Sequence, residues 1–176
     1  MIRLELIDEK NIEYAIKIQN KIFPEYNGKR NYYGSLGEYS QTKYFLIYDD
    51  NNTCIGTTGL YYYKNDFDNA WLGFFGFLEE YRNKGYGTVA LKLTEDYMHN
   101  IGFKFVRLFT DRLGNDIAIN FYKKNGYIFE NYDCKLEELK DLFDVVIGSK
   151  SLTGGYVPKW NNKFINISKQ TKKQMN

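Results

Sequence analysis

A short segment rich in glycine and basic residues, Tyr81–Gly87, has the residue types that bind a phosphate group. It lies between an apolar run typical of a strand and a helical pattern of apolar residues. Gly85 and Gly87 leave backbone N–H groups unshielded, and the beginning of a helix carries about half a positive charge. Arg82 and Lys84 add full positive charges. We therefore predict that this turn binds a phosphate or pyrophosphate.

Two other nucleotide-binding patterns fit this segment less well. The P-loop spacing Gly-x-x-x-x-Gly-Lys-Ser/Thr is absent. The dinucleotide fingerprint Gly-x-Gly-x-x-Gly would place its third glycine at Ala90, where alanine is tolerated, so context must decide. The turn falls in the middle of the chain, and Arg82 and Lys84 crowd an approach that the dinucleotide fold keeps neutral. For the segment taken alone, an ordinary turn between a strand and a helix stays open as the alternative.

A second segment, 115–127, follows about one strand–helix–strand unit later. Asn115 suits the N-cap of a helix, and Gly126 suits the position just after its end. Between them, three residues share one face of a short helix: Ala118, Phe121 and Tyr122.

With these two segments the sequence resembles the GCN5-related N-acetyltransferases. The acetyl-CoA loop of that family reads Arg/Gln-x-x-Gly-x-Gly/Ala, and Arg82–Gly87 matches it. The later family segment reads Asn-x-x-Ala-x-x-Phe/Leu-Tyr-x-x-x-Gly-Phe/Tyr, and 115–127 fills every fixed position. The resemblance covers roughly residues 1–150, and the motifs that carry it lie within 72–127.

The resemblance implies a single-domain α/β (α+β) fold, in which helices flank a mixed, mostly antiparallel sheet of about seven strands with a splayed parallel pair. We expect this N-acetyltransferase domain to span residues 1–150, followed by a partly ordered C-terminal extension, 151–176. The periodicity of the chain predicts strands at 2–7, 45–48, 55–63, 71–78, 103–110, 127–132 and 145–149. It predicts four helices. The first begins after Asp8 and ends at Pro24, the second runs from Gly85 to about Asn100, the third follows Asn115, and the fourth spans 136–143. Residues 25–42 show no clear period.

In the family, the strands that correspond here to 71–78 and 103–110 diverge, and the pantetheine arm of the coenzyme enters the gap. Its amides pair with the freed backbone of the first strand. Gly73 and Gly76 suit the close approach of another backbone, although packing glycines are an equal alternative. The residues that the resemblance implies for contact with acetyl-CoA are Phe75, Gly76, Phe77, Arg82, Asn83, Lys84, Gly85, Tyr86, Gly87, Thr88, Asn115 and Tyr122.

The implied reaction transfers an acetyl group from acetyl-CoA to a primary amine of a small molecule or peptide. A lysine-like amine is mostly protonated at neutral pH, and freeing it costs roughly 4–5 kcal/mol. A carboxylate or an ordered water chain should therefore relay that proton. Some family members use a carboxylate in the splayed strand, but 71–78 contains none. The candidates nearby, each of which could instead be surface charge, are Glu25, Glu38, Glu79, Glu80 and Asp111.

Tyr122 is the residue that the resemblance assigns to catalysis, beside the coenzyme sulfur, as a donor to the departing thiolate. Transfer of a proton from a tyrosine to a thiolate is uphill by about 2 kcal/mol on reference pKa values. Stabilisation of the thiolate by a hydrogen bond and full proton transfer therefore both stay open, as does a core tyrosine beside Phe121. A backbone N–H near Phe77 or Leu78 could stabilise the charge that develops on the carbonyl.

The composition excludes several other classes of protein. The chain has 176 residues, 18% of them aromatic, which fits one folded domain with a sizeable core. A net charge of +2 gives no footprint for nucleic acid, and the basic cluster in the tail is more typical of a solvated terminus: Lys169, Lys172 and Lys173. Without an apolar run of membrane length, we expect a cytoplasmic protein that does not contact a membrane.

The cysteine and histidine content predicts no metal. Cys54 and Cys134 are far apart in sequence, which favours single buried thiols over a disulfide. With His99 as the only histidine, neither a metal-ligand spacing nor a Ser-His-Asp set exists.

Two rival functions stay open beside N-acetyltransfer to an amine acceptor. One is a regulatory module that binds acyl-CoA and has lost turnover. The other, a protein that stacks nucleic-acid bases on exposed tyrosines, is disfavoured by the weak net charge. The sequence does not identify the amine acceptor. It is compatible with a homodimer. Tyrosines that could line an aromatic pocket for cations or planar ligands are Tyr26, Tyr32, Tyr33, Tyr39, Tyr61, Tyr62 and Tyr63.

Overall fold

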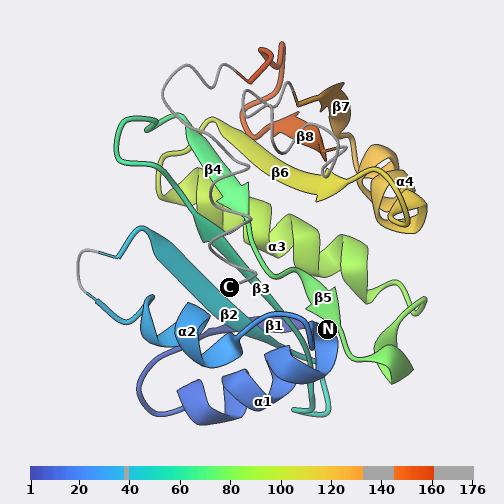
Figure 1. Ribbon diagram of the computed structural model, residues 1–176. Helices are drawn as coiled ribbons and strands as arrows, with labels where there is room; N and C mark the ends of the chain where they lie inside the picture. Colours follow the sequence, from blue (N-terminus) through green and yellow to red (C-terminus); the bar gives the residue numbers. More distant parts are fainter. Residues whose placement is uncertain (38–39, 133–144, 161–176) are drawn as a thin grey trace.

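The computed structural model describes residues 1–37, 40–132 and 145–160 (Figure 1). The helices of this part are α1 (Ile12–Ile22), α2 (Gly28–Tyr33), α3 (Tyr86–Asn100) and α4 (Asp116–Lys124), with a 3₁₀ turn at Glu79–Tyr81. The strands are β1 (Arg3–Leu6), β2 (Thr42–Tyr48), β3 (Cys54–Tyr61), β4 (Asn69–Leu72), β5 (Gly76–Phe77), β6 (Phe105–Asp111), β7 (Ile128–Asn131) and β8 (Val145–Ser151). The predicted helix at 136–143 and Cys134 lie outside the described residues.

The described strands form one sheet in the order β1-β2-β3-β4-β6-β8-β7, and β5 pairs with β3 beside β4. The pair β4–β6 is parallel, and the other pairs are antiparallel. This arrangement confirms the predicted fold class, including the single parallel pair within a mostly antiparallel sheet. The last strand, β8, lies between β6 and β7, an order that the sequence does not reveal.

Alternation along β2 divides the core between two faces of the sheet. Tyr44 and Leu46 pack against α1 and α2, whereas Ile47 packs with Ala90 of α3 on the opposite face. Residues that alternate along a strand point to opposite faces, so one strand contributes to both layers. Figure 1 shows α1 and α2 together on one side, with α4 beside the end of β6.

The predicted continuous strand 71–78 is wrong, because a β-bulge divides it into β4 and β5. Leu60 pairs with Leu72, and Thr57 pairs with Gly76. The segment from Leu72 to Gly76 therefore has one more residue than the part of β3 that faces it. Phe74 lies within this bulge and has a positive φ of 47°. Since β6 pairs only with Asn69–Trp71 of this segment, the backbone beyond β4 turns away from β6.

The helix starts also differ in detail from the predictions. Asp8 does not cap α1; its carboxylate accepts a hydrogen bond from the backbone N–H of Lys10, and Asn11 is the N-cap residue. Within 25–42, where no period was found, α2 forms and Asn27 caps it by accepting from the N–H of Arg30 at 3.0 Å. A helix this short shows less than two turns of periodicity, so only its cap residue signals it.

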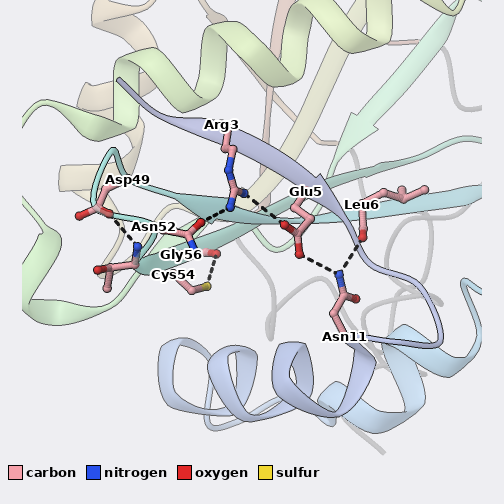
Figure 2. A network of polar contacts seen from close by, with 9 residues as sticks. Arg3, Glu5, Leu6, Asn11, Asp49, Asn52, Cys54 and Gly56 are labelled. Carbon is pink, nitrogen blue, oxygen red and sulfur yellow. Dashed lines mark hydrogen bonds and ion pairs between the residues drawn. The ribbon is translucent and has the colours of Figure 1, made fainter.

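A polar network joins β1, α1 and the turn between β2 and β3, as Figure 2 shows. The Arg3 guanidinium donates to Glu5 at 3.2 Å and also to Asn52. The Asn11 side chain donates to Glu5 and to the carbonyl of Leu6. Because these contacts hold the edge strand to the beginning of α1, they fix the layer on which α2 and the bulge then pack.

Trp160 packs on the sheet face opposite α3, whereas Leu152 packs against the cluster that contains Leu91 and Met98 of α3. Trp160 lies edge-to-face on Trp71 with ring centroids 4.9 Å apart. The buried Arg107 donates to Asn69 at 2.7 Å and to the carbonyl of Pro158 at 2.8 Å. The beginning of the C-terminal extension therefore contacts the sheet through Trp160. The division of the chain at residue 150 stays a prediction.

Candidate functional site

The turn before α3 has the backbone conformation of an anion-binding loop. Gly85, the N-cap residue of α3, has a φ of 83°, and Asn83 has a φ of 59°. A Cβ at Gly85 would meet no atom within 4 Å, so the glycine is needed for its left-handed conformation and not for space. The amides that follow it open a fifteen-residue helix and point out of the turn.

The two basic residues of the turn are placed differently. The Nε–H of Arg82 donates to the carbonyl of Phe77 at 3.0 Å, which fixes the guanidinium beside β5. Lys84 instead lies over the ring of Tyr81, with its Nζ 5.3 Å from the centroid. Arg82 is therefore the better oriented cation of the pair.

A cleft of about 580 Å³ lies between this turn and α4; we call it the turn cleft. All the residues that the resemblance implies for the coenzyme line this cleft, with the exception of Lys84. Its lining residues are Phe75, Gly76, Phe77, Tyr81, Arg82, Asn83, Gly85, Tyr86, Gly87, Thr88, Gly114, Asn115, Ile117, Ala118, Phe121 and Tyr122. Its size is typical of a cleft for a small ligand or cofactor.

Aromatic rings form the wall of the turn cleft that faces β6. Phe75 stacks on Phe121 with centroids 6.0 Å apart, and it is tilted against Tyr122 at 6.2 Å. Gly87 allows α3 to approach α4 closely, because a Cβ there would lie 3.1 Å from the ring of Phe121. Gly76, by contrast, is required by α1: a Cβ would lie 2.6 Å from Ile22 and 2.7 Å from Phe23. The packing interpretation of Gly76 is therefore supported.

A second cleft opens on the other side of the bulge; we call it the aromatic cleft. It is lined by Phe23, Tyr26, Tyr44, Tyr61, Leu72, Gly73, Phe74, Phe75, Leu108, Phe109, Thr110, Asn115, Ala118 and Tyr122. Four residues line both clefts: Phe75, Asn115, Ala118 and Tyr122. The two clefts thus meet where the backbone leaves β6, and Tyr122 stands at their junction.

Tyr122 is in a poorly solvated position on the last part of α4. Burial raises the pKa of Tyr122 well above its usual range. The hydroxyl therefore stays protonated at neutral pH. It can donate or accept a hydrogen bond, but it does not act as a tyrosinate base. Asn115 is the N-cap residue of α4, as predicted, although its side chain makes no capping hydrogen bond. Its side chain instead borders both clefts.

None of the predicted base candidates among the described residues lines either cleft. Burial raises the pKa of Tyr26 in the aromatic cleft, and the negative charges of Glu25 and Asp111 raise it further. Glu79 and Glu80 lie on the exposed 3₁₀ turn. Glu38 lies outside the described residues.

The tyrosines predicted for an aromatic pocket lie in different environments. Tyr26 and Tyr61 line the aromatic cleft. Tyr32 is buried against Tyr44, Tyr62 packs on Phe103, and Tyr63 packs on Trp71. The exposed Tyr33 donates to Glu13 at 2.6 Å, and Tyr39 lies outside the described residues. Sequence reasoning missed the aromatic contributions of Phe23, Tyr44, Phe74 and Phe109, because the bulge and the strand register that gather them leave no local signal.

The sequence matches the family model described as "Acetyltransferase (GNAT) family" over residues 12–127. The chain belongs to the GNAT family of acetyltransferases. The matched range contains every described residue that lines either cleft. Family membership places the chain among the N-acetyltransferases and accounts for the strand, turn and helix arrangement at the turn cleft. No curated protein sequence matches the chain significantly.

Solved structures share the GNAT fold at low sequence identity. Spermidine N-acetyltransferase from Vibrio cholerae, solved with CoA and spermine, has a TM-score of 0.69 and 14% identity, covering 86% of this chain and 96% of that chain. The ribosomal-protein-S18-alanine N-acetyltransferase from Escherichia coli has a TM-score of 0.66 and 16% identity, covering 92% and 100%. A GNAT-family acetyltransferase from Staphylococcus aureus Mu50 has a TM-score of 0.62 and 18% identity, covering 86% and 99%.

Among the described residues, no group of three His, Cys, Asp or Glu side chains is arranged to hold a metal ion. None of the helices in those ranges combines the length and apolar composition needed to cross a bilayer.

Proposed function

We propose that this GNAT protein transfers an acetyl group from acetyl-CoA to a primary amine, with the coenzyme in the turn cleft and the amine in the aromatic cleft. The observation that carries the proposal is the junction of the two clefts at Tyr122. Acetyl transfer needs two ligands that meet at one point, and a cleft for a single ligand would have no use for such a junction.

The residues of the turn cleft suit a coenzyme diphosphate and its arm. The amides after Gly85 and the oriented guanidinium of Arg82 provide donors for phosphate oxygens. Asn83, Tyr86, Thr88 and the glycines complete the rim of the cleft. Near Phe75 the backbone has left β6, so its amide and carbonyl groups are available to an extended ligand. When bound, acetyl-CoA supplies the thioester whose carbonyl carbon the amine attacks.

Tyr122 would act on the leaving group. The C–N bond forms as the C–S bond breaks, and a proton from the amine nitrogen must reach the sulfur, directly or through solvent. Because burial holds the Tyr122 hydroxyl protonated, it serves as a donor to the developing thiolate rather than as a base. Removal of the amine's first proton falls to water, which can pass the proton on to a carboxylate outside the lining of the cleft, such as Glu25 or Asp111.

The test is Tyr122→Phe, which removes the hydroxyl and keeps the ring. We expect kcat to fall about tenfold or more, as for the loss of one transition-state donor, while acetyl-CoA affinity is kept. The measurement combines thiol release over a mixed panel of primary amines with calorimetric titration of coenzyme A. The matched control is Tyr33→Phe, on an exposed tyrosine of α2.

Unchanged turnover in Tyr122→Phe would remove this residue from the mechanism. A native chain that binds coenzyme A but acetylates no amine of the panel would instead be a regulatory module that binds acyl-CoA. A chain that gives no response to millimolar coenzyme A would contradict the proposal altogether.

A further inference from the structure

The composition of the walls of the aromatic cleft restricts the kind of amine that the cleft can receive. Most of its lining residues are aromatic, and the lining residues that the structure describes carry no formal charge. Glu25 and Asp111 act on Tyr26 but do not line the cleft themselves. An acceptor with several ammonium groups would therefore find rings along the described walls, and no carboxylate to pair with its other charges.

Phe74 lies at the centre of the rings on one side of the cleft. Its ring lies 5.7 Å from Phe23, 5.6 Å from Tyr26 and 5.7 Å from Tyr44, in edge-to-face geometry each time. Rings at such distances and angles attract one another, and the same geometry would recognise one further flat ring.

The backbone at Phe74 is held in a conformation that phenylalanine avoids. Its φ of 47° lies in the left-handed region, which a residue with a Cβ rarely adopts. The buried Thr57 donates from its Oγ1 to the carbonyl of Phe74 at 2.8 Å, and the bulge supplies the extra residue that makes this turn. Glycine or asparagine would be the ordinary choice at such a position, and this makes the ring of Phe74 the candidate for a functional role.

We propose that the amine acceptor carries a flat aromatic ring on a short chain, and that Phe74 is the residue that selects it. This inference rests on the proposed acetyltransferase function and adds the chemical class of the acceptor. The ring of the acceptor seats against Phe74 and its neighbours, and the short chain carries the amine to the junction at Tyr122. The absence of a described carboxylate along the walls favours entry of the neutral amine, the form that attacks the thioester.

The first experiment compares four amines as acceptors for the native chain: 2-phenylethylamine, 2-cyclohexylethylamine, ethylamine and spermidine. We expect kcat/KM for 2-phenylethylamine to exceed that for ethylamine by about tenfold or more, since the ring adds buried apolar area and aromatic contacts. The cyclohexyl compound should fall between the two, and spermidine should be the poorest. Equal values for 2-phenylethylamine and ethylamine, or a preference for spermidine, would overturn the inference.

The second experiment uses Phe74→Gly, which deletes the ring at a position whose backbone glycine adopts without strain. We expect kcat/KM for 2-phenylethylamine to fall about tenfold, and that for ethylamine to change less than about threefold. The calorimetric affinity for coenzyme A should be unchanged, because Phe74 does not line the turn cleft. The matched control is Phe67→Ala, which removes an exposed aromatic ring in the loop before β4.

Folding of the variants is checked by circular dichroism and thermal unfolding. Should Phe74→Gly fail to fold, Phe74→Leu keeps apolar volume but no ring, and it should erase the preference for the phenyl over the cyclohexyl compound. Retention of that preference in Phe74→Leu would overturn the role of Phe74.

The proposed function and this inference fail differently. If coenzyme A binds but no amine is acetylated, binding of 2-phenylethylamine to the complex with coenzyme A is measured directly by calorimetry. Binding that Phe74→Gly weakens supports the inference even then, and the absence of any binding overturns it. Rapid acetylation confined to polyamines would support the acetyltransferase function and overturn the inference.

Discussion

Arg82 is held beside the turn cleft by a single contact to the backbone. Its Nε–H donates to the carbonyl of Phe77 at 3.0 Å, which leaves the terminal nitrogens of the guanidinium to reach a ligand. Lysine has the same charge but lacks this second donor, so it could not keep both contacts. The functional difference between the two basic residues of the turn therefore depends on geometry and not on charge.

We expect Arg82→Lys to raise the KM for acetyl-CoA about fivefold to tenfold, with a smaller change in kcat. The physical reason is the loss of one charge-assisted hydrogen bond and of the orientation of the cation. Lys84→Arg is the matched control, because Lys84 lies over Tyr81 outside the turn cleft. Steady-state kinetics at varied acetyl-CoA measures both parameters. Because both substitutions conserve the charge, an unchanged KM in both variants would show that net charge alone matters, and an equal loss in the two would contradict the special role of Arg82.

Two features arrange the elements around the site: the bulge between β4 and β5, and the close approach of α3 to α4 at Gly87. The bulge between β4 and β5 turns the backbone away from β6. It places Phe74 in the aromatic cleft alone and Phe75 at the junction of the two clefts. Gly87 then lets the beginning of α3 contact Phe121 of α4, which closes the far wall of the turn cleft. The splay of the parallel pair is thus a consequence of a register shift by one residue.

Gly87→Ala tests the contact between α3 and α4. A Cβ at this position would lie 3.1 Å and 3.2 Å from two atoms of the Phe121 ring, so the ring or the helix must shift. We expect the free energy of unfolding to fall by about 1–3 kcal/mol, as for other overpacked sites, together with weaker binding of acetyl-CoA. Urea unfolding and calorimetry provide the measurements.

The double variant Gly87→Ala with Phe121→Leu distinguishes crowding from other causes. Leucine is smaller at the point of contact, so it should restore part of the stability lost in Gly87→Ala. If the two changes add without compensation, crowding against Phe121 is not the reason for the glycine.

At the scale of the whole molecule, several buried tyrosines tie the layers together. Tyr127 donates to Glu95 of α3 at 2.9 Å, and Lys150 of β8 donates to the same carboxylate at 2.7 Å. Burial raises the pKa of Tyr44, Tyr61 and Tyr127 well above the usual tyrosine value. These side chains contribute to stability as neutral groups.

This predicts how stability depends on alkaline pH. Below the unfolded tyrosine pKa of about 10 both states are protonated, and the contribution is fully present. Above it the unfolded chain loses protons that the folded chain still holds, so the free energy of unfolding falls as pH rises. We expect urea midpoints to be nearly constant from about pH 8 to 9 and to decline from about pH 10 upward.

The ionisation of tyrosine, followed by its ultraviolet absorbance, should show a late cooperative phase that coincides with unfolding measured by circular dichroism. Titration of all tyrosines at about pH 10 in a chain that stays folded would contradict the burial of these hydroxyls.

The sequence by itself determined the features that depend on local spacing. The turn with Gly85, the helix that follows it, and the segment that leads to Tyr122 are short patterns whose conformations follow from neighbouring residues. Because the family has these patterns at the same separation, they also predicted the family, the fold class and most of the residues that line the turn cleft. The chemistry of acetyl transfer was readable for the same reason.

Only the tertiary structure decided the register shift, the position of β8 and the composition of the aromatic cleft. The extra residue near Phe74 exists only relative to β3, a strand with which it pairs across a distance in sequence. Phe23 from the end of α1, Tyr44 from β2 and Phe109 from β6 meet because the sheet and its helices bring them together. Long-range pairing leaves no period in the local sequence, so the acceptor side of this enzyme could be seen only after the chain was folded.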